Sequence, residues 1–226
     1  MFHMRKFSQN TPENCKAAVC GIIDEINALP TMSLSELSPE KTALIVVDVV
    51  NGFIREGAMS SPLIESIIPP VAALMESCKS RGIPVAAFAD CHKEGCAEFA
   101  SFPPHCLENT SESELADELK AVGGYLLIKK NSTNGFHEEQ FKAFLSGIPD
   151  TDTFIVTGDC TDICVLQFCL ALKTWFTKQD KQVRIIVPVN CVETYDAPYH
   201  DADFMNIAAY KLMKDSGVAF VSAVTE

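Results

Sequence analysis

Short apolar runs alternate with longer amphipathic segments along most of this chain. The runs have the length of buried strands, and between them apolar residues recur at the three- and four-residue spacing of a helix. Strands are expected at residues 43–47, 85–89, 125–128, 154–156, 183–187 and 218–221. Strands and helices that alternate six times, with no internal repeat, predict a doubly wound, mostly parallel six-stranded α/β sheet with helices on both faces, a Rossmann-like architecture.

The same pattern predicts helices at residues 62–81, 111–122, 138–145 and 199–216, and another that begins after Asp162. Ser111 and Glu114 have the spacing of a capping box, so we expect the second of these helices to begin at Ser111.

Residues 1–40 precede the alternation. Residues 14–29 place apolar side chains on one helical face, Pro30 ends that pattern, and SLSELSPEK is typical of a linker. We expect residues 1–40 to be a helical extension and linker that packs on the domain or on a second subunit of a homo-oligomer. Residues 41–226 are then expected to form one α/β domain.

Composition narrows the possible partners and the compartment. The chain has 226 residues and a formal net charge of -12, which argues against nucleic-acid and anionic-membrane partners. No apolar run is long enough to span a bilayer, and the first fifteen residues show no apolar signal-peptide core. Several of the ten cysteines lie inside apolar runs. Free thiols in a reducing cytoplasm are therefore expected.

Polar residues come directly after four of the predicted strands. Asp48, Asp90, Lys130 and the turn that leads to Cys164 each stand directly after an apolar run. Folds of this class bind ligands just beyond the carboxyl ends of parallel strands. The sequence therefore predicts that these residues share one site.

Cys164 is the candidate nucleophile. TFIVTGDCTDICVLQF predicts a strand, a tight turn and a helix with Cys164 in its first turn, where free N–H groups and the helix dipole favour a thiolate. Asp48 could take the thiol proton, and the Lys130 ammonium could stabilise the anion. The backbone N–H groups of Cys160 and Cys164 could form an oxyanion hole. The alternative is an inert buried cysteine beside solvated loop residues.

A candidate metal site follows the second predicted strand. Asp90 and His92 form a D-x-H pair, and Glu98 and His105 lie in the same loop. Two imidazoles and one or two carboxylates suit Zn²⁺, or Mn²⁺ or Fe²⁺ with added waters. A polar surface loop and a thiolate site, built from Cys91, Cys96 and Cys106, are alternatives. The D-x-H set is preferred because alternation along the strand puts His92, but not Cys91, on the side of Asp90.

Four segments in order, IVVDVVNGF, FADCH…E…FPPHC, KKNSTNGF and GDCTDICV, resemble the isochorismatase-like cysteine hydrolases, and among these the nicotinamidases most. The resemblance covers about residues 42–223. It implies a catalytic Asp–Lys–Cys triad of Asp48, Lys130 and Cys164. It also implies a divalent metal, held by Asp90, His92, His105 and Glu98, that binds the pyridine nitrogen of nicotinamide. A cis peptide at Asp159–Cys160, which would aim the Cys160 N–H at the oxyanion, is implied as well.

The segments DVVNGF and NGF depart from the strings common in that family, at positions that line the substrate pocket in relatives. Amide hydrolysis is therefore implied more firmly than nicotinamide itself. Phe53 and Phe102 are candidates to stack on a flat ring, with a plain core role as the alternative.

Three hypotheses follow from these observations. The first is a metal-assisted hydrolase of a small-molecule amide that proceeds through a cysteine thioester. The second is another hydrolase of the same superfamily that acts on a carbamoyl or ureido compound without metal. The third is a non-catalytic protein that binds a small metabolite on the same scaffold.

Overall fold

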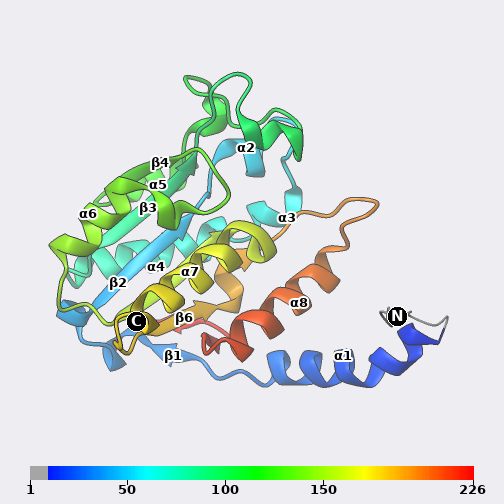
Figure 1. Cartoon of the computed structure of the whole chain (residues 1–226). Helices are drawn as coiled ribbons and strands as arrows, with labels where there is room; N and C mark the ends of the chain where they lie inside the picture. The colour runs from blue at the N-terminus through cyan, green and yellow to red at the C-terminus, as the bar shows by residue number, and fades with distance from the viewer. Residues whose placement is uncertain (1–9) are drawn as a thin grey trace.

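A parallel sheet forms the centre of the molecule (Figure 1). The computed structural model describes residues 10–226. The strand order is β4-β3-β2-β5-β6-β8, with β7 beside the end of β5, and every pair is parallel. The strands are β2 (Thr42–Val47), β3 (Val85–Asp90), β4 (Leu126–Lys130), β5 (Thr153–Asp159), β6 (Arg184–Pro188), β7 (Val192–Glu193) and β8 (Ala219–Val221). The predicted doubly wound fold is confirmed, with seven strands in place of six because the two-residue β7 is too short to show an apolar run.

Helices cover both faces of the sheet, as predicted. They are α1 (Thr11–Asn27), α2 (Asn51–Ile54), α3 (Pro62–Glu65), α4 (Ile68–Ser80), α5 (Asp117–Val122), α6 (Glu139–Gly147), α7 (Leu166–Thr177) and α8 (Ala202–Asp215). Strand β2 is buried along its whole length. Its alternate side chains Leu44 and Val46 pack into one hydrophobic cluster, and Ile45 and Val47 pack into the other, because successive side chains of a strand point to opposite faces.

The capping box predicted at Ser111 is wrong. Ser111–Ser113 is a short 3₁₀ turn, Glu114 is extended, and α5 begins only at Asp117. The carbonyl of Glu114 accepts the N–H of Asn51 at 2.9 Å, and Leu115 bridges Val50. These contacts with a distant segment fix residues 114–116 in an extended conformation, so tertiary packing overrides the local helix signal.

The long helix predicted at residues 62–81 is two helices, α3 and α4. Each has a proline in its first turn, where a missing N–H does no harm. The break between them turns the chain before α4 packs its buried face on the sheet.

The predicted N-terminal helix is present as α1, and residues 1–9 of the predicted extension lie outside the described residues. Figure 1 shows α1 beside α8 at the edge of the molecule, with its first turns beyond the rest of the chain. After α1, β1 (Met32–Ser33) pairs with β9 (Val224–Thr225), which ties the linker to the C-terminal segment.

Two further expectations can be compared with the described residues. All ten cysteines are free thiols. Among residues 10–226, no helix has the length and apolar character that crossing a membrane would require.

Candidate active site

The ends of four neighbouring strands bring the predicted polar residues together. Asp48 directly follows β2, Asp90 and Lys130 end β3 and β4 as opposed residues of the ladder, and Cys164 follows β5 through a turn. All four are buried, with exposed fractions that range from 0% for Asp48 to 5% for Cys164. The sheet thus removes two carboxylates, an ammonium and a thiol from water in one place.

Lys130 lies at the centre of this group. Its Nζ is 2.9 Å from Asp48 Oδ2 and 2.9 Å from Asp90 Oδ1. It also donates to the carbonyl oxygen of Ser132 at 3.0 Å and lies 3.8 Å from Cys164 Sγ. A buried ammonium needs such partners, because an unpaired charge away from water is very costly.

The turn that carries Cys164 is tightly constrained. Strand β5 ends at a cis peptide between Asp159 and Cys160, as the resemblance implied, and residues Thr161–Val165 form a π-helical turn before α7. Gly158 has φ +111°, and a Cβ there would lie 1.9 Å from the carbonyl oxygen of Val47. Only glycine therefore fits where β5 passes β2 and leads into the turn.

The surroundings of Cys164 favour the protonated thiol over the thiolate. Burial raises its pKa well above the usual value, and although Lys130 opposes this rise, the carboxylates of Asp48 and Asp90 add to it. The expectation that the helix start would favour a thiolate is therefore not met in the resting site. Burial also raises the pKa of Asp48 to about 6, against the pull of Lys130 and with a further push from Asp90. A carboxyl with that pKa is mostly ionised at neutral pH and able to accept a proton.

The four predicted metal ligands converge. One ligand atom from each of Asp90, His92, Glu98 and His105 lies within 4.8 Å of the others. Asp90 Oδ2 is 2.9 Å from His92 Nε2 and 3.1 Å from His105 Nε2, and Glu98 Oε1 is 3.7 Å and 3.8 Å from the same two nitrogens. Among the described residues, this is the group that can hold a metal, and it contains no cysteine.

Outer contacts orient both imidazoles. His92 Nδ1 faces Asn131 Oδ1 at 3.0 Å, and His105 Nδ1 faces the carbonyl oxygen of Pro103 at 2.7 Å. Because both partners are acceptors, each Nδ1 carries a proton, and an imidazole that loses its other proton has a lone pair on Nε2, the atom that faces Asp90 and Glu98. Lone pairs and carboxylate oxygens that face one another suit a bound divalent cation, so the residues fit Zn²⁺, Mn²⁺ or Fe²⁺.

A small cavity lies between Cys164 and the four predicted metal ligands. Phe53, Phe102, Glu98, Cys160 and Cys164 line it, together with His105, Met59, Thr133 and Ile163. Its volume of about 20 Å³ is room for roughly one water. Both predicted ring-stacking residues therefore line the same cavity as Cys164, and their ring centroids lie 5.5 Å and 6.2 Å from that of His105.

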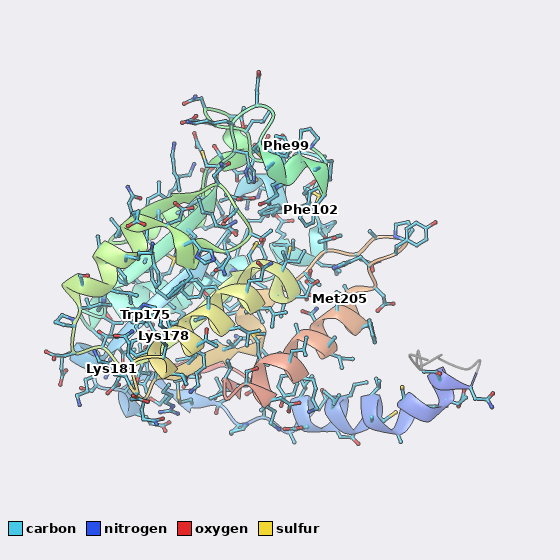
Figure 2. All side chains as sticks on the ribbon, in the orientation of Figure 1. Phe99, Phe102, Trp175, Lys178, Lys181 and Met205 are labelled. Atoms are coloured by element: carbon cyan, nitrogen blue, oxygen red, sulfur yellow. The ribbon has the colours of Figure 1, made fainter. Side chains whose placement is uncertain are left out.

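The sequence did not point to Phe99, which stands beside Phe102 on the loop after β3 (Figure 2). Its ring lies 5.3 Å from that of His92 and 5.6 Å from that of His105, so it walls the same group. Phe99 directly follows the predicted ligand Glu98 in the chain, and this position is the sequence feature that could have indicated its place in the site.

A hydrogen-bond network behind the turn was also missed. Thr194 donates to Asp162 Oδ1 at 2.6 Å, and His200 Nε2 lies 2.9 Å from Asp162 Oδ2. The other nitrogen of His200 faces the carbonyl oxygen of Tyr195 at 2.9 Å, and the two rings stack 3.9 Å apart. This network fixes Asp162, two residues before Cys164. No spacing in the sequence indicates a contact between residues 38 positions apart.

Comparison with known proteins identifies a family and a relative of this chain. The isochorismatase domain matches residues 42–217 of this chain. Nicotinamidase 1 of Arabidopsis thaliana is 31% identical over 177 residues, which cover 70% of this chain and 72% of that protein.

Solved structures give the same fold. N-carbamoylsarcosine amidase from Thermoplasma acidophilum superposes with a TM-score of 0.67 at 25% identity, over 80% of this chain and 95% of that one. Pyrazinamidase of Pyrococcus horikoshii in complex with zinc superposes with a TM-score of 0.65 at 24% identity, over 80% of this chain and 98% of that one.

Proposed function

This chain belongs to the isochorismatase family, and from that premise we propose that it is an amide hydrolase whose catalytic triad is Asp48, Lys130 and Cys164. One observation carries the proposal. A buried ammonium lies 2.9 Å from a carboxylate and 3.8 Å from a thiol, at the C-terminal edge of a parallel sheet. Burial of these three groups is costly, and it is useful where a thiol must lose its proton and attack a carbonyl.

In the proposed reaction, Asp48 accepts the proton of Cys164, and the sulfur attacks the carbonyl carbon of the amide. The N–H groups of Cys160 and Cys164 stabilise the oxygen anion that forms, and Lys130 balances the charge. Asp48 returns its proton to the leaving nitrogen, so ammonia departs and a thioester remains. Asp48 then takes a proton from water, whose oxygen attacks the thioester. The carboxylic acid leaves and Cys164 recovers its proton.

Asp90, His92, Glu98 and His105 would hold a divalent metal, and zinc is our first choice. When bound, such a metal offers a Lewis-acidic contact for a ring nitrogen of the substrate. Lys130 pairs with the metal-facing Asp90 and with Asp48, so it links the two halves of the site.

Nicotinamide is the proposed substrate, with nicotinate and ammonia as products. A flat ring would bind between Phe53 and Phe102, with its carboxamide near Cys164. Because the cavity has room for roughly one water, the half-buried side chains Phe102 and Met59 must move to admit the ring.

The second candidate is hydrolysis of a carbamoyl or ureido compound. The similarity to N-carbamoylsarcosine amidase favours it, whereas the four converging metal ligands favour the pyridine amide. A non-catalytic binding protein is the least favoured alternative, because it would have no need of three buried reactive groups.

We further propose a cytosolic enzyme in which residues 41–226 carry the activity. Residues 1–40 are proposed as an extension, with a contact in a homo-oligomer as its role.

The test is an ammonia-release assay on nicotinamide and on N-carbamoyl amino acids, with metal analysis of the purified protein. Nicotinamide is expected to react, and Cys164→Ala is expected to lose turnover by several orders of magnitude while it still binds nicotinate. Cys20→Ser, on the exposed surface of α1, is the matched control and should behave like the parent. Hydrolysis retained in Cys164→Ala would sink the proposal. Exclusive hydrolysis of carbamoyl compounds by a metal-free protein would favour the second candidate.

A further inference from the structure

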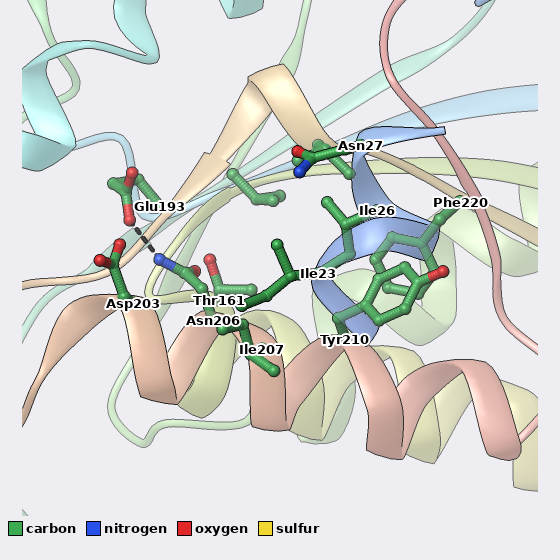
Figure 3. Close-up of a pocket in the computed structure, with 12 residues that line it drawn as sticks. Ile23, Ile26, Asn27, Thr161, Glu193, Asp203, Asn206, Ile207, Tyr210 and Phe220 are labelled. Carbon is green, nitrogen blue, oxygen red and sulfur yellow. Dashed lines mark hydrogen bonds between the residues drawn. The ribbon is translucent and has the colours of Figure 1, made fainter. Parts of the chain in front are cut away.

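A second cavity, of about 360 Å³, lies between α1, α8 and the back of the turn that carries the nucleophile (Figure 3). Helix α1 contributes Ile23 and Ile26, helix α8 contributes Ile207 and Tyr210, and the turn contributes Thr161. Its volume falls in the range of small-molecule sites, and it is separate from the small cavity beside Cys164. None of the predicted catalytic or metal-ligating residues lines it.

The two ends of this second cavity differ in character. Figure 3 shows Glu193 and Asp203 together at one end, near Asn206, and the side chains of Ile23, Tyr210 and Phe220 toward the other. Among residues 10–226, no lysine, arginine or histidine lines the cavity. One end is therefore negative, and the other is apolar and aromatic.

Glu193 is held in place. Its Oε1 accepts the amide N–H of Asn206 at 2.5 Å and the backbone N–H of Thr194 at 2.9 Å. The other carboxylate oxygen of Glu193 and the side-chain oxygen of Asn206 remain as acceptors. A preorganised carboxylate with a neighbouring acidic side chain favours a cation.

Two buried hydroxyls add a second, independent observation. Thr161 Oγ1 and Tyr210 Oη have no hydrogen-bond partner within the described part of the chain, although both residues are only 3% exposed. Unpaired buried hydroxyls are rare in proteins, because each loses its bonds to water without replacement. Both residues line the second cavity, and Figure 3 shows Thr161 beside Asn206 near the acidic end, where a bound molecule can satisfy its hydroxyl.

We propose that the second cavity is an effector site for a small organic cation, a protonated amine with an apolar or aromatic body. The ammonium group binds at Glu193 and Asp203, and the body packs between Ile23, Ile207 and Phe220. The carboxylates favour a cation, and the apolar end adds affinity for one that has an apolar body.

The site is placed to influence catalysis. Thr161 lines this cavity, whereas Ile163 and Cys164 of the same π-helical turn line the small one. Strand β7, which supplies Val192 and Glu193, pairs with Gly158 and Asp159 at the base of that turn. A ligand that contacts Thr161 and Glu193 therefore acts on both supports of the nucleophile, and its binding is expected to couple to the reactivity of Cys164.

Binding is tested by calorimetry on the full chain at pH 7, with three probes that share a phenethyl group and differ in the polar group it carries: 2-phenylethylamine, 2-phenylethanol and 3-phenylpropanoate. The protonated amine should bind at least tenfold more tightly than the alcohol, and the anion should bind least. Equal affinities for the three probes, or no binding of the amine, would overturn the proposal that the second cavity binds an organic cation.

Variants locate the binding. Ile207→Trp should fill the cavity and abolish amine binding, and Glu193→Gln, which keeps the acceptor for Asn206, should weaken it about tenfold. Asp215→Asn removes an exposed carboxylate from the same helix and should leave the affinity unchanged. Amine binding that survives Ile207→Trp in a protein that melts as the parent does would overturn the assignment.

Coupling is measured without any substrate, as the rate at which iodoacetamide alkylates Cys164. Saturating amine should change this rate by about fivefold or more in the parent and leave it unchanged in Ile207→Trp. An unchanged rate in the parent would overturn the effector role. Because neither readout needs amide turnover, failure here is distinct from failure of the proposed reaction.

Discussion

Two buried aspartates at the ends of neighbouring strands have opposite acidities. Asp48 follows β2 and Asp90 ends β3, and each has a carboxylate oxygen 2.9 Å from Lys130 Nζ. Burial raises the pKa of Asp48 to about 6, with Lys130 opposing and Asp90 adding to the rise. Burial would also raise the pKa of Asp90, but Lys130 and hydrogen bonds from His105 and His92 hold it well below the usual value.

The comparison shows that the shared ammonium of Lys130 does not by itself set the acidity of its two partners. What differs is the second partner, because Asp90 faces two imidazoles and Asp48 faces a thiol. Asp90 is thereby kept as a permanent anion suited to a metal, and Asp48 is left able to exchange a proton. Two carboxylates whose environments push their pKa values apart are the usual mark of divided acid–base roles.

The largest effect should come from removal of the titrating carboxylate alone. Asp48→Asn is expected to lower kcat/KM by roughly 10²–10⁴-fold, the range for loss of a general base. Its metal content should stay that of the parent, whereas Asp90→Asn should lose metal as well as activity. Steady-state kinetics with elemental analysis separate the two variants. Equal metal loss in both variants would contradict the assignment of proton transfer to Asp48 and of metal binding to Asp90.

The next effect concerns the orientation of the imidazoles on the Asp90 side. Asn131→Ala removes the acceptor of His92 Nδ1, so metal affinity is expected to weaken by about 10–100-fold. Asn134→Ala is the matched control and should keep the affinity, because the side-chain oxygen of Asn134, in the same loop, accepts the N–H of Phe136 rather than that of an imidazole. Competition with a metal-binding dye measures both variants, and unchanged affinity in Asn131→Ala would contradict the orienting role.

The pH profile probes the Asp48 side directly. Because burial raises the pKa of Asp48 to about 6 and the base must be ionised, kcat/KM should be flat near neutral pH and fall tenfold per unit below about pH 6. The sign follows from the raised pKa, since an aspartate of ordinary acidity would keep the rate constant to about pH 4. A rate that stays level between pH 7 and pH 5 would contradict this assignment.

A third strand-end aspartate sharpens the comparison, with the smallest expected effect. Asp159 ends β5, is fully buried, and neither of its carboxylate oxygens has a hydrogen-bond partner among residues 10–226. Burial, followed by repulsion from Asp48, raises the pKa of Asp159 well above its usual value. Asp159→Leu is expected to raise the free energy of unfolding by about 1 kcal/mol at pH 7.

The sign of that effect depends on pH. A group whose pKa is raised in the folded state loses stabilising proton binding as pH rises through its unfolded and then its folded pKa. The stability gap between Asp159→Leu and the parent should therefore widen from pH 4 to pH 7 in urea titrations. Asp150→Leu, at an exposed aspartate, should change stability by less than about 0.5 kcal/mol. A gap that is constant with pH would show that Asp159 titrates normally.

Local pattern was sufficient for the strands and for the residues that follow them. Apolar runs such as residues 43–47 and 154–156 are buried strands, because a strand covered on both faces must be apolar at every position. The carboxyl ends of parallel strands share one edge, so Asp48, Asp90, Lys130 and Cys164 could be placed together without a structure. The capping-box signal at Ser111 failed because the bridge between Val50 and Leu115 decided that segment.

The order of the elements and the chemical groups at the strand ends could be predicted from the residues alone, because both depend on periodicity and chain direction. The acidity of those groups could not, because pKa values depend on burial and on partners from other strands, as Asp48 and Asp90 show. The same holds for the contact of Asp162 with His200 and for the cavity between α1 and α8, whose walls come from opposite ends of the chain. Such features arise from distances in space, which residue spacing along the chain does not encode.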